Sequence, residues 1–378
     1  MNMKKITTIL LTGIILTLSA CYPENFNQTT FHPYGPVADR QLDIFWLILA
    51  GGVVVFILVE ALLIYSAIKY RRKDTEGLPN QVHGNHKLEF IWTAIPAVVV
   101  LVFSILSINT LFFAAEVPKD SEGNLGTHVQ LQAIGHQWWF EFRYPNPNDE
   151  SQEVVLANEV YIPVGVPVRI ELDSVDVIHS FWVPKLAGKV DMVPKPKDID
   201  GNKDLNHMWF EATEPGVYFG QCTEFCGASH ANMRFKVIAV SQPEYDSWLM
   251  NQTEPAAEWN DPLVKEGAAV FKSAGCSGCH ALKPTAKAGS KGRLGPNLTH
   301  LASRTYLAAG LMNNTDDIDT TDINEAYLQE NLRAWIADPA SIKPGNLMAA
   351  QGAVYNDPDR ALTESQISAL VAYLMTLK

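Results

Sequence analysis

Five side chains in the middle part of the sequence together suit a soft or borderline metal ion. Cys222, Cys226, His230 and Met233 lie close together, and His179 precedes them by some distance. Thiolate, imidazole and thioether groups are ligands that copper prefers, whereas magnesium and calcium prefer oxygen. One copper ion needs only one cysteine, so the second thiolate predicts two bridged copper ions, with a backbone carbonyl completing the ligand set. A Cys222–Cys226 disulfide is the alternative, and it is reasonable in an exported protein.

A second cysteine motif begins the last third of the chain. Cys276-Ser-Gly-Cys279-His280 has the spacing of covalent haem c attachment, in which both thiols bond to the haem and the imidazole faces the iron. Met348 follows a proline–glycine turn and is the expected second axial ligand, and Met/His ligation raises the reduction potential. His300 is a rival ligand because it is nearer in sequence. A redox disulfide or a zinc site would use similar cysteines.

The composition excludes several classes of protein. Of the 378 residues, 47% are hydrophobic and 19% are charged, and the formal net charge is -12. These values argue against intrinsic disorder and against a basic nucleic-acid-binding protein. The acidic excess lies mainly in residues 117–255, which carry 20 acidic and 10 basic side chains. Such a surface repels nucleic acid and is suited to attract basic proteins.

The N-terminus has the pattern of an export signal. A basic start up to Lys5 precedes an apolar run and the small residues Leu-Ser-Ala, which lead directly into Cys21. This pattern resembles a bacterial lipoprotein signal, in which residues 1–20 are removed and Cys21 becomes the lipidated first residue. An ordinary export signal with an incidental cysteine is the alternative.

Residues 21–116 form an N-terminal segment and a predicted transmembrane hairpin. Two apolar stretches, 44–68 and 90–113, are each long enough to cross a bilayer as a helix. The basic cluster at 69–73 predicts a cytoplasmic connection, so both termini are expected outside the cytoplasm of a bacterial inner membrane. Glu60 interrupts the first span, where pairing with a partner subunit, snorkelling to the headgroups and proton handling all fit.

The remaining sequence predicts two further domains. Residues 117–251 contain many short alternating runs, which indicate a β-sandwich or barrel, and Ser241 is a possible N-cap of a closing helix. Residues 252–262 are polar and contain prolines, as expected of a linker. Residues 263–378 are predicted to form a helical domain. Its expected helices lie at 263–273, about 321–337 and 363–377.

The copper motif, with His-Ser-Phe-Trp-Val-Pro upstream, resembles the binuclear copper A site of cytochrome c oxidase subunit II. The likeness extends to Trp92 and Pro96 in the second span and to the run Gly-His-Gln-Trp138-Trp139. It covers residues 40–250 and implies a two-helix hairpin that carries an all-β, cupredoxin-like domain. With the all-α cytochrome c domain behind it, the whole chain is similar to subunit II of the caa-type haem–copper oxidases.

The resemblance implies roles for individual residues. The implied copper A ligands are His179, Cys222, Glu224 through its backbone carbonyl, Cys226, His230 and Met233. Asp191 and the Glu224 carboxylate match positions near a magnesium site at the interface with the catalytic subunit. Glu89 matches a carboxylate at the mouth of a proton channel, and Trp138 matches the residue through which electrons enter.

Further residues complete the expected assignments. The segment around Pro296 resembles the part of cytochromes c whose proline packs beside the proximal histidine, here His280. His136 and His207 are expected to be structural or exposed to solvent. All five cysteines are then assigned, one to lipid at Cys21, two to copper and two to haem.

The function implied is that of an electron-accepting subunit of a terminal respiratory oxidase. Electrons would pass from a donor, such as a quinol–cytochrome c reductase or a small cytochrome c, through haem c and copper A to catalytic subunit I. That subunit would reduce oxygen to water and pump protons, because nothing in this chain resembles its many-helix core. A copper A-containing nitric oxide reductase is the main rival, and a membrane-anchored electron shuttle is a weaker one. A nitrous oxide reductase and a quinol oxidase subunit fit the motifs less well.

Overall fold

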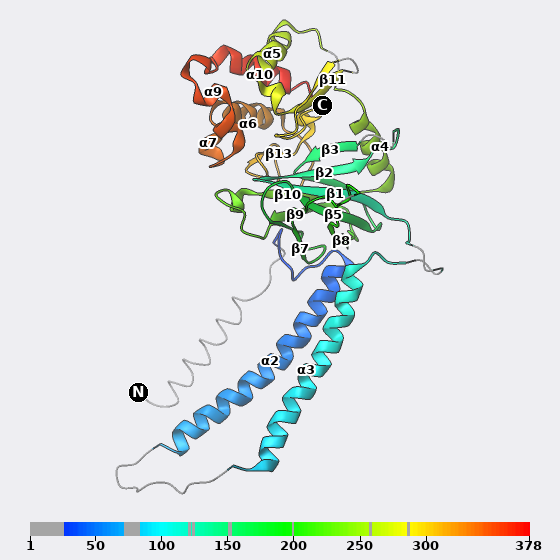
Figure 1. Cartoon of the computed structure of the whole chain (residues 1–378), viewed down its shortest axis with the longest axis vertical. Coiled ribbons are helices and arrows are strands. Elements are labelled where there is room, and N and C mark those ends of the chain that lie inside the picture. The colour runs from blue at the N-terminus through cyan, green and yellow to red at the C-terminus, as the bar shows by residue number, and fades with distance from the viewer. Residues whose placement is uncertain are drawn as a thin grey trace.

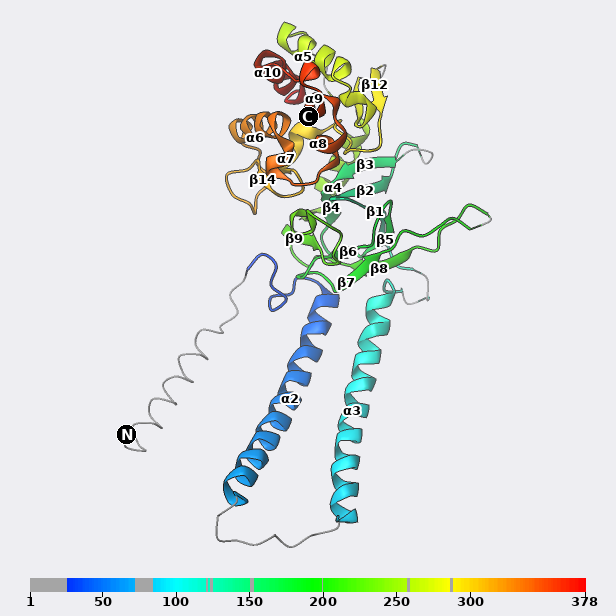
Figure 2. The same ribbon diagram turned by 60° about the vertical axis from the view of Figure 1, so that its left-hand side comes forward.

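The computed structural model describes residues 26–71, 84–119, 122, 125–149, 153–198, 200–256, 259–285 and 288–378. The expected signal peptide and the expected lipidation site at Cys21 lie outside these residues. Figures 1 and 2 show three parts in succession along the longest axis: two long helices, a β-sandwich and a mainly helical part at the C-terminal end. The architecture is therefore an apolar two-helix hairpin, an all-β sandwich and a mainly helical C-terminal domain, as the sequence predicts.

Two long apolar helices form the hairpin. Helix α2 (Pro36–Lys69) has 34 residues and helix α3 (His86–Ala115) has 30, so both exceed the roughly 20 residues that span a bilayer. Their apolar surfaces are exposed, as expected of helices that face lipid or other subunits. The Asn85 side chain caps α3 by accepting hydrogen bonds from the backbone N–H groups of Lys87 and Leu88.

The outer ends of both helices are fastened to the β-sandwich. Before α2, the backbone N–H of Tyr34 donates to the carbonyl of Lys185 over 2.7 Å. At the end of α3, Trp209 Nε1 donates to the carbonyl of Phe113 over 2.9 Å, and the two rings meet edge to face at 5.4 Å. The hairpin and the sandwich thus have a defined mutual orientation.

The sandwich consists of two five-stranded sheets, ordered β3-β2-β1-β5-β8 and β4-β10-β9-β6-β7. The β1–β5 and β4–β10 pairs are parallel, and the other pairs are antiparallel. Phe140, Phe181 and Phe235 fill the space between the sheets, with ring centroids 4.6–4.7 Å apart in two of the pairs. The strands are β1 (Val129–His136), β2 (Trp139–Pro145), β3 (Glu153–Ala157), β4 (Glu159–Pro163), β5 (Val168–Ser174), β6 (His179–Trp182), β7 (Lys189–Met192), β8 (Asn206–Phe210), β9 (Gly216–Cys222) and β10 (Arg234–Val240).

The sequence contains seven short alternating or apolar runs, at 128–134, 138–144, 159–162, 168–173, 209–211, 217–220 and 234–240, and strands β3, β6 and β7 have no counterpart among them. Strands β6 and β7 have only four residues each, too few to show a clear alternation of polar and apolar side chains, and β3 lies at a sheet edge. The helix expected after Ser241 is present as α4 (Gln242–Thr253). The backbone N–H of Ser241 donates to the Glu244 carboxylate over 3.0 Å, which fixes the start of this helix.

The C-terminal domain packs three main helices around an apolar core. The expected helices are present, and the middle one begins at Glu325 because the Asn324 side chain caps it there. Several shorter elements between them were not predicted. The elements are α5 (Pro262–Ser273), η2 (Cys276–Gly278), β11 (Ala281–Thr285), β12 (Ala288–Lys291), η3 (Leu301–Ser303), β13 (Tyr306–Leu307), β14 (Met312–Asn313), α6 (Glu325–Ala337), α7 (Pro339–Ile342), α8 (Leu347–Gln351), α9 (Ala353–Asn356), η4 (Pro358–Arg360) and α10 (Glu364–Leu374).

The segment between the two extramembrane domains is packed along its described residues. Ala256 is 3% exposed, and its backbone N–H donates to the carbonyl of Lys283 over 3.3 Å. The ring of Trp259 meets Tyr373 edge to face at 5.6 Å. The polar composition of 252–262 predicts a linker, but its few apolar side chains attach it to the C-terminal core.

Candidate copper and haem sites

The predicted copper-binding residues come together at one end of the second sheet. Cys222 is the last residue of β9, and Met233 directly precedes β10, so the connecting loop places Cys226 and His230 between them. His179 begins β6, whose Phe181 is paired with Cys222 of β9. The antiparallel pairing of β6, β9 and β10 therefore assembles residues that are separated in sequence.

The side chains of these five residues form one compact cluster. The Sγ atoms of Cys222 and Cys226 are 3.7 Å apart. His179 Nδ1 lies 3.9 Å from Cys222 Sγ, and His230 Nδ1 lies 3.5 Å from Cys226 Sγ. Met233 Sδ lies 3.9 Å from Cys226 Sγ. A disulfide would require a separation of about 2.05 Å, so both thiols are free and the disulfide alternative is not realised.

The donor set of this cluster fits a pair of copper ions. Two cysteine sulfurs lie between two imidazole nitrogens, and a thioether sulfur completes one side. On the other side, the backbone oxygen of Glu224 lies 3.2 Å from Cys222 Sγ, while the Glu224 side chain is exposed. These soft and borderline donors suit copper, and two thiolates at this spacing can be shared by two ions.

The local environment prepares one thiol for metal binding. A hydrogen bond from Cys226 chiefly lowers the pKa of the Cys222 thiol to about 4, and His179 lowers it further against the effect of burial. The pKa of Cys226 is raised, chiefly by its hydrogen bond with Cys222, then by burial, and then by the negative charge of Cys222. The thiolate is the form that binds a metal ion.

The imidazole of His179 is held in one orientation. Its Nε2 lies 2.8 Å from the Asp176 carboxylate, which accepts only, so Nε2 carries a proton and Nδ1 faces Cys222. Burial opposes ionisation of Asp176, but hydrogen bonds from His179 and from the backbone of Gln137 lower its pKa overall. A Cβ atom at Gly135 would lie 2.5 Å from the His179 ring, so a glycine is required beneath it.

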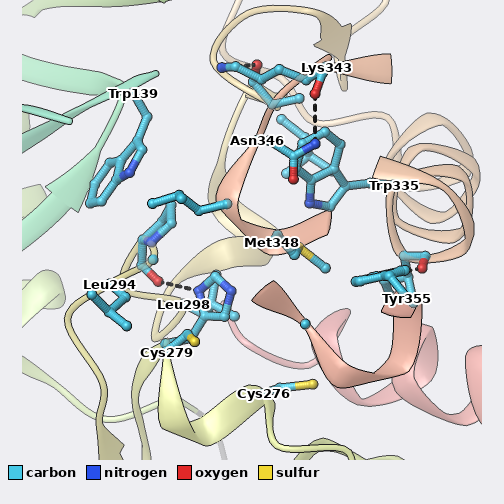
Figure 3. A pocket seen from close by; sticks show the side chains of 18 of the residues that line it. Trp139, Cys276, Cys279, Leu294, Leu298, Trp335, Lys343, Asn346, Met348 and Tyr355 are labelled. Carbon is cyan, nitrogen blue, oxygen red and sulfur yellow. Dashed lines mark hydrogen bonds between the residues drawn. The ribbon is translucent and has the colours of Figure 1, made fainter. Parts of the chain in front are cut away.

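The haem-attachment residues surround a cavity of about 420 Å³ in the C-terminal domain (Figure 3). Cys276 and Cys279 come from the η2 turn after α5, and Met348 reaches the same cavity from α8. Both cysteines are free thiols, so no disulfide is formed between them. His300 does not line the cavity, and its Nε2 lies 3.0 Å from the Glu254 carbonyl instead. The geometry therefore favours Met348 over His300 as the second axial ligand.

His280 has the orientation expected of a proximal ligand. Its Nδ1 lies 2.8 Å from the carbonyl oxygen of Pro296, so Nδ1 donates and Nε2 is the unprotonated nitrogen. Burial lowers the pKa of His280, which keeps the imidazole neutral. With its largely apolar lining, two thiols, an oriented imidazole and a thioether, the cavity has the groups that covalent haem c requires.

Trp138 connects the two sites. It lines the haem cavity, and its Nε1 donates to the backbone carbonyl of Cys226 over 2.9 Å. Trp139 lines the same cavity (Figure 3), and His136 stacks on it at a centroid distance of 4.1 Å, consistent with the structural role expected for that histidine. The contact of Trp138 with both sites was not predicted, because sequence motifs do not reveal how two domains meet.

The remaining candidate residues lie apart from these two sites. Asp191 of β7 is exposed and is paired with Ser180 of β6. Strand β6 also pairs with the end of β9, two residues before Glu224. Glu89 lies in the first turn of α3, with His86 Nδ1 3.2 Å from its carboxylate. Glu60 is exposed on α2, and His207 is exposed on β8.

Two polar residues near the copper cluster were missed by sequence reasoning. Asp176 lies three positions before His179, a spacing that suggested no contact because the turn between them was not foreseen. Lys343 lies in the proline–glycine turn before Met348, and nothing in the sequence indicates that its side chain is almost fully buried.

Three protein families match successive parts of the chain. The family described as "Cytochrome C oxidase subunit II, transmembrane domain" matches residues 32–110. The family described as "Cytochrome C oxidase subunit II, periplasmic domain" matches residues 129–240, and "Cytochrome c" matches residues 264–378. The subunit II family implies copper A, and the cytochrome c family implies haem c.

Curated relatives extend over nearly the full length. "Cytochrome c oxidase subunit 2" of Alkalihalophilus pseudofirmus is 38% identical, over 97% of this chain and 96% of the relative. The protein of the same name from Bacillus sp. (strain PS3) is 35% identical, over 93% of this chain and 91% of the relative. "Quinol oxidase subunit 2" of Bacillus cereus is 31% identical but matches only 70% of this chain.

The matches to the two cytochrome c oxidase subunits extend over more than nine tenths of this chain, and residues 264–378 match the cytochrome c family. Proteins of this kind are membrane subunits of a haem–copper oxidase and associate with subunit I rather than acting alone. The chain belongs to the cytochrome c oxidase subunit II family, and it carries a C-terminal cytochrome c domain.

Proposed function

We propose that this chain is the subunit through which electrons enter a proton-pumping terminal oxidase. Electrons pass from an external donor to haem c, then to copper A, and then to subunit I, which reduces oxygen to water. The contact of Trp138 with both sites carries this proposal, because one indole lines the haem cavity and hydrogen-bonds the copper loop.

The copper pair would be held by residues at the ends of strands β6 and β9 and in the loop that connects β9 to β10. Cys222 and Cys226 would supply two thiolates that both ions can share, and the remaining residues would each supply one donor atom. The proposed ligands are His179, Cys222, Glu224 through its carbonyl oxygen, Cys226, His230 and Met233. When bound, the copper pair and the haem each supply a one-electron carrier.

Four of these ligand residues are buried and thus shielded from water. Met233 and His179 are fully buried, and Cys222 and Cys226 are 4% and 3% exposed. Asp176 fixes the orientation of the His179 ring through its hydrogen bond to Nε2. Donor atoms held in place by a surrounding shell cannot rearrange between oxidation states, which favours rapid electron transfer.

The haem is held by covalent and axial contacts. Cys276 and Cys279 bond to its side groups, and His280 offers Nε2 because its Nδ1 donates to the Pro296 carbonyl. Met348 of α8, which lines the same cavity, would supply the second ligand to the iron. This ligand pair raises the reduction potential of the haem.

The hairpin and its surroundings connect the two sites to the rest of the complex. Helices α2 and α3 cross the membrane with both outer ends extracytoplasmic, and a lipid at Cys21 adds a further anchor. Asp191 and Glu224 hold magnesium at the interface with subunit I. Glu89 lies at the mouth of a proton channel in that subunit, and the donor is a quinol–cytochrome c reductase or a small cytochrome c.

A single substitution in the full complex tests this function. Cys222→Ser removes one bridging thiolate, so we expect oxygen consumption to be lost while the haem c spectrum and the reduction of haem c by a donor remain. Thr223→Ser, which removes one methyl group from the adjacent residue, is the control and should keep turnover. Retained oxygen consumption in Cys222→Ser would contradict the proposal.

A further inference from the structure

The turn before Met348 is fastened to the copper-binding domain. Lys343 Nζ donates to the carbonyl oxygen of Trp138 over 2.5 Å and to that of Ala308 over 3.2 Å. Ser229, which directly precedes His230 in the copper loop, donates from Oγ to the carbonyl of Pro344 over 2.6 Å. Lys343 and Ser229 are 4% and 0% exposed, so both contacts are shielded from water.

Gly345 in this turn lies directly against the indole of Trp138. It has a φ of +79°, which favours glycine, and a Cβ atom there would lie 3.0 Å from the ring. Gly227 of the copper loop approaches the same indole from its own domain, with a Cβ position also 3.0 Å away. Trp138 is therefore enclosed by both domains and is only 9% exposed.

A second group of buried hydrogen bonds also joins the two domains. Glu159 of β4 accepts hydrogen bonds from the backbone N–H and the hydroxyl of Thr305, at 2.7 and 2.6 Å. Lys236 of β10 donates to the Thr305 hydroxyl over 3.2 Å and to the carbonyl of Ile318 over 3.0 Å. Because buried polar groups are costly when they lose their hydrogen-bond partners, these contacts favour the relative orientation in which all of them are made.

These contacts restrict which donor reaches the copper domain. We propose that the turn Lys343–Asn346 is an interdomain clamp, which holds the haem domain on Trp138 and reserves that residue for the haem of the same chain. An external donor protein then delivers electrons to the haem domain only. This inference rests on the proposed function and adds the residues that enforce the order of transfer.

The transfer that the clamp orders would move electrons and no atoms. One electron leaves the donor and reduces the haem iron from ferric to ferrous. The ferrous iron then returns to ferric as one electron passes to the copper pair, which is reduced by one electron. No bond forms and no proton is transferred between the two domains, so geometry and not chemistry is what Lys343 controls.

The order of reduction in the intact complex tests the exclusion of direct transfer. The oxidised complex is mixed rapidly with reduced flavodoxin, a small donor protein without haem, and the absorbances of haem c and copper A are followed together. We expect copper reduction to begin only after haem c is reduced. Copper reduction without this lag would overturn the proposal, since the donor would then reach the copper domain directly.

Substitution of Lys343 tests the clamp itself. In Lys343→Met we expect electron transfer from haem c to copper to slow severalfold, because the substitution removes the hydrogen bonds that hold the turn against Trp138. Reduction of haem c by flavodoxin and its methionine-to-iron charge-transfer band should be unchanged. Lys265→Met, at an exposed position on α5, is the matched control and should behave as the unaltered chain.

Hydrogen exchange supplies a readout that does not depend on turnover. Exchange of the amides of residues 137–140 should be faster in Lys343→Met than in the unaltered chain, because that substitution releases the Trp138 carbonyl. If Lys343→Met does not assemble, Ser229→Ala removes only the hydrogen bond to Pro344 and should show the same changes to a smaller extent. Equal transfer rates and equal exchange in the variant and the unaltered chain would overturn the clamp.

The two proposals fail in different ways. If haem c in the unaltered complex is reduced but never reoxidised by copper, the proposed function itself is wrong. If haem c is reoxidised at the same rate in Lys343→Met, the function stands and only the clamp is wrong.

Discussion

Replacing Asp176 by asparagine isolates the contribution of one hydrogen bond to copper binding. Asp176 Oδ1 lies 2.8 Å from His179 Nε2, and its other oxygen accepts from the backbone N–H of Gln137 over 2.7 Å. Asparagine keeps the shape of the side chain, but it has one acceptor oxygen instead of two. Either His179 or Gln137 then faces an amide N–H, so the imidazole either loses its hydrogen bond or keeps one to an uncharged and weaker acceptor.

The size of the effect follows from the position of Asp176. It touches a ligand and is not one, and loss of such a partner typically costs 10–100-fold in metal affinity. This range corresponds to about 1.4–2.8 kcal/mol. The side chain of Asp176 is 27% exposed, so water can partly replace the lost acceptor, and we expect a value near the lower end.

Competition with a copper chelator on the purified chain in detergent measures this affinity. Asp246→Asn is the matched control, because Asp246 is exposed on α4 and its carboxylate accepts from Gln242 over 2.7 Å, within the same helix. We expect weaker copper binding in Asp176→Asn, an unchanged stoichiometry and normal binding in the control. Unchanged affinity in Asp176→Asn would refute the view that the carboxylate orients His179.

Three further predictions concern the haem, the acid stability and the core. Met348→Ala should keep covalent haem c but lower its reduction potential in a spectroelectrochemical titration, since the thioether ligand is lost. Although burial opposes it, His136 and Arg143 lower the pKa of Glu141 overall. The ionised Glu141 therefore stabilises the fold above the pKa of glutamate in the unfolded chain, about 4.3, and this stabilisation is lost as the pH falls through the lower pKa of the folded state. Glu141→Gln should therefore show a weaker decrease in the free energy of unfolding on acid titration. Phe235→Ala should destabilise the sandwich by about 3–5 kcal/mol in denaturant unfolding, because Phe235 is 1% exposed between the sheets.

The chemistry of both sites could be predicted from the sequence because it depends on residue type and local spacing. The copper loop from Cys222 to Met233 lies within one connection between antiparallel strands, so its ligands are close in space whatever surrounds them. The haem motif from Cys276 to His280 lies within a single turn. The hairpin helices could be predicted for a similar reason, since a bilayer imposes a length and a composition on any segment that crosses it.

Residues that act across the fold could not be predicted in this way. The approach of His179 to Cys222 requires the pairing of β6 with β9, and β6 is too short to show a pattern. The resemblance to a known family supplied His179 as a ligand, whereas Asp176 and Gly135 beside it gave no such signal.

The sequence by itself determined which cofactors the chain is expected to bind, because the types and spacing of the proposed ligands are typical of copper A and haem c. Only the tertiary structure decided how the two sites meet, with Trp138 enclosed between the copper loop and the turn from Lys343 to Asn346. The physical reason is that contacts between domains depend on the mutual orientation of two finished surfaces. The contacts of Lys343 and Gly345 with Trp138 exist only once the two domains are packed together.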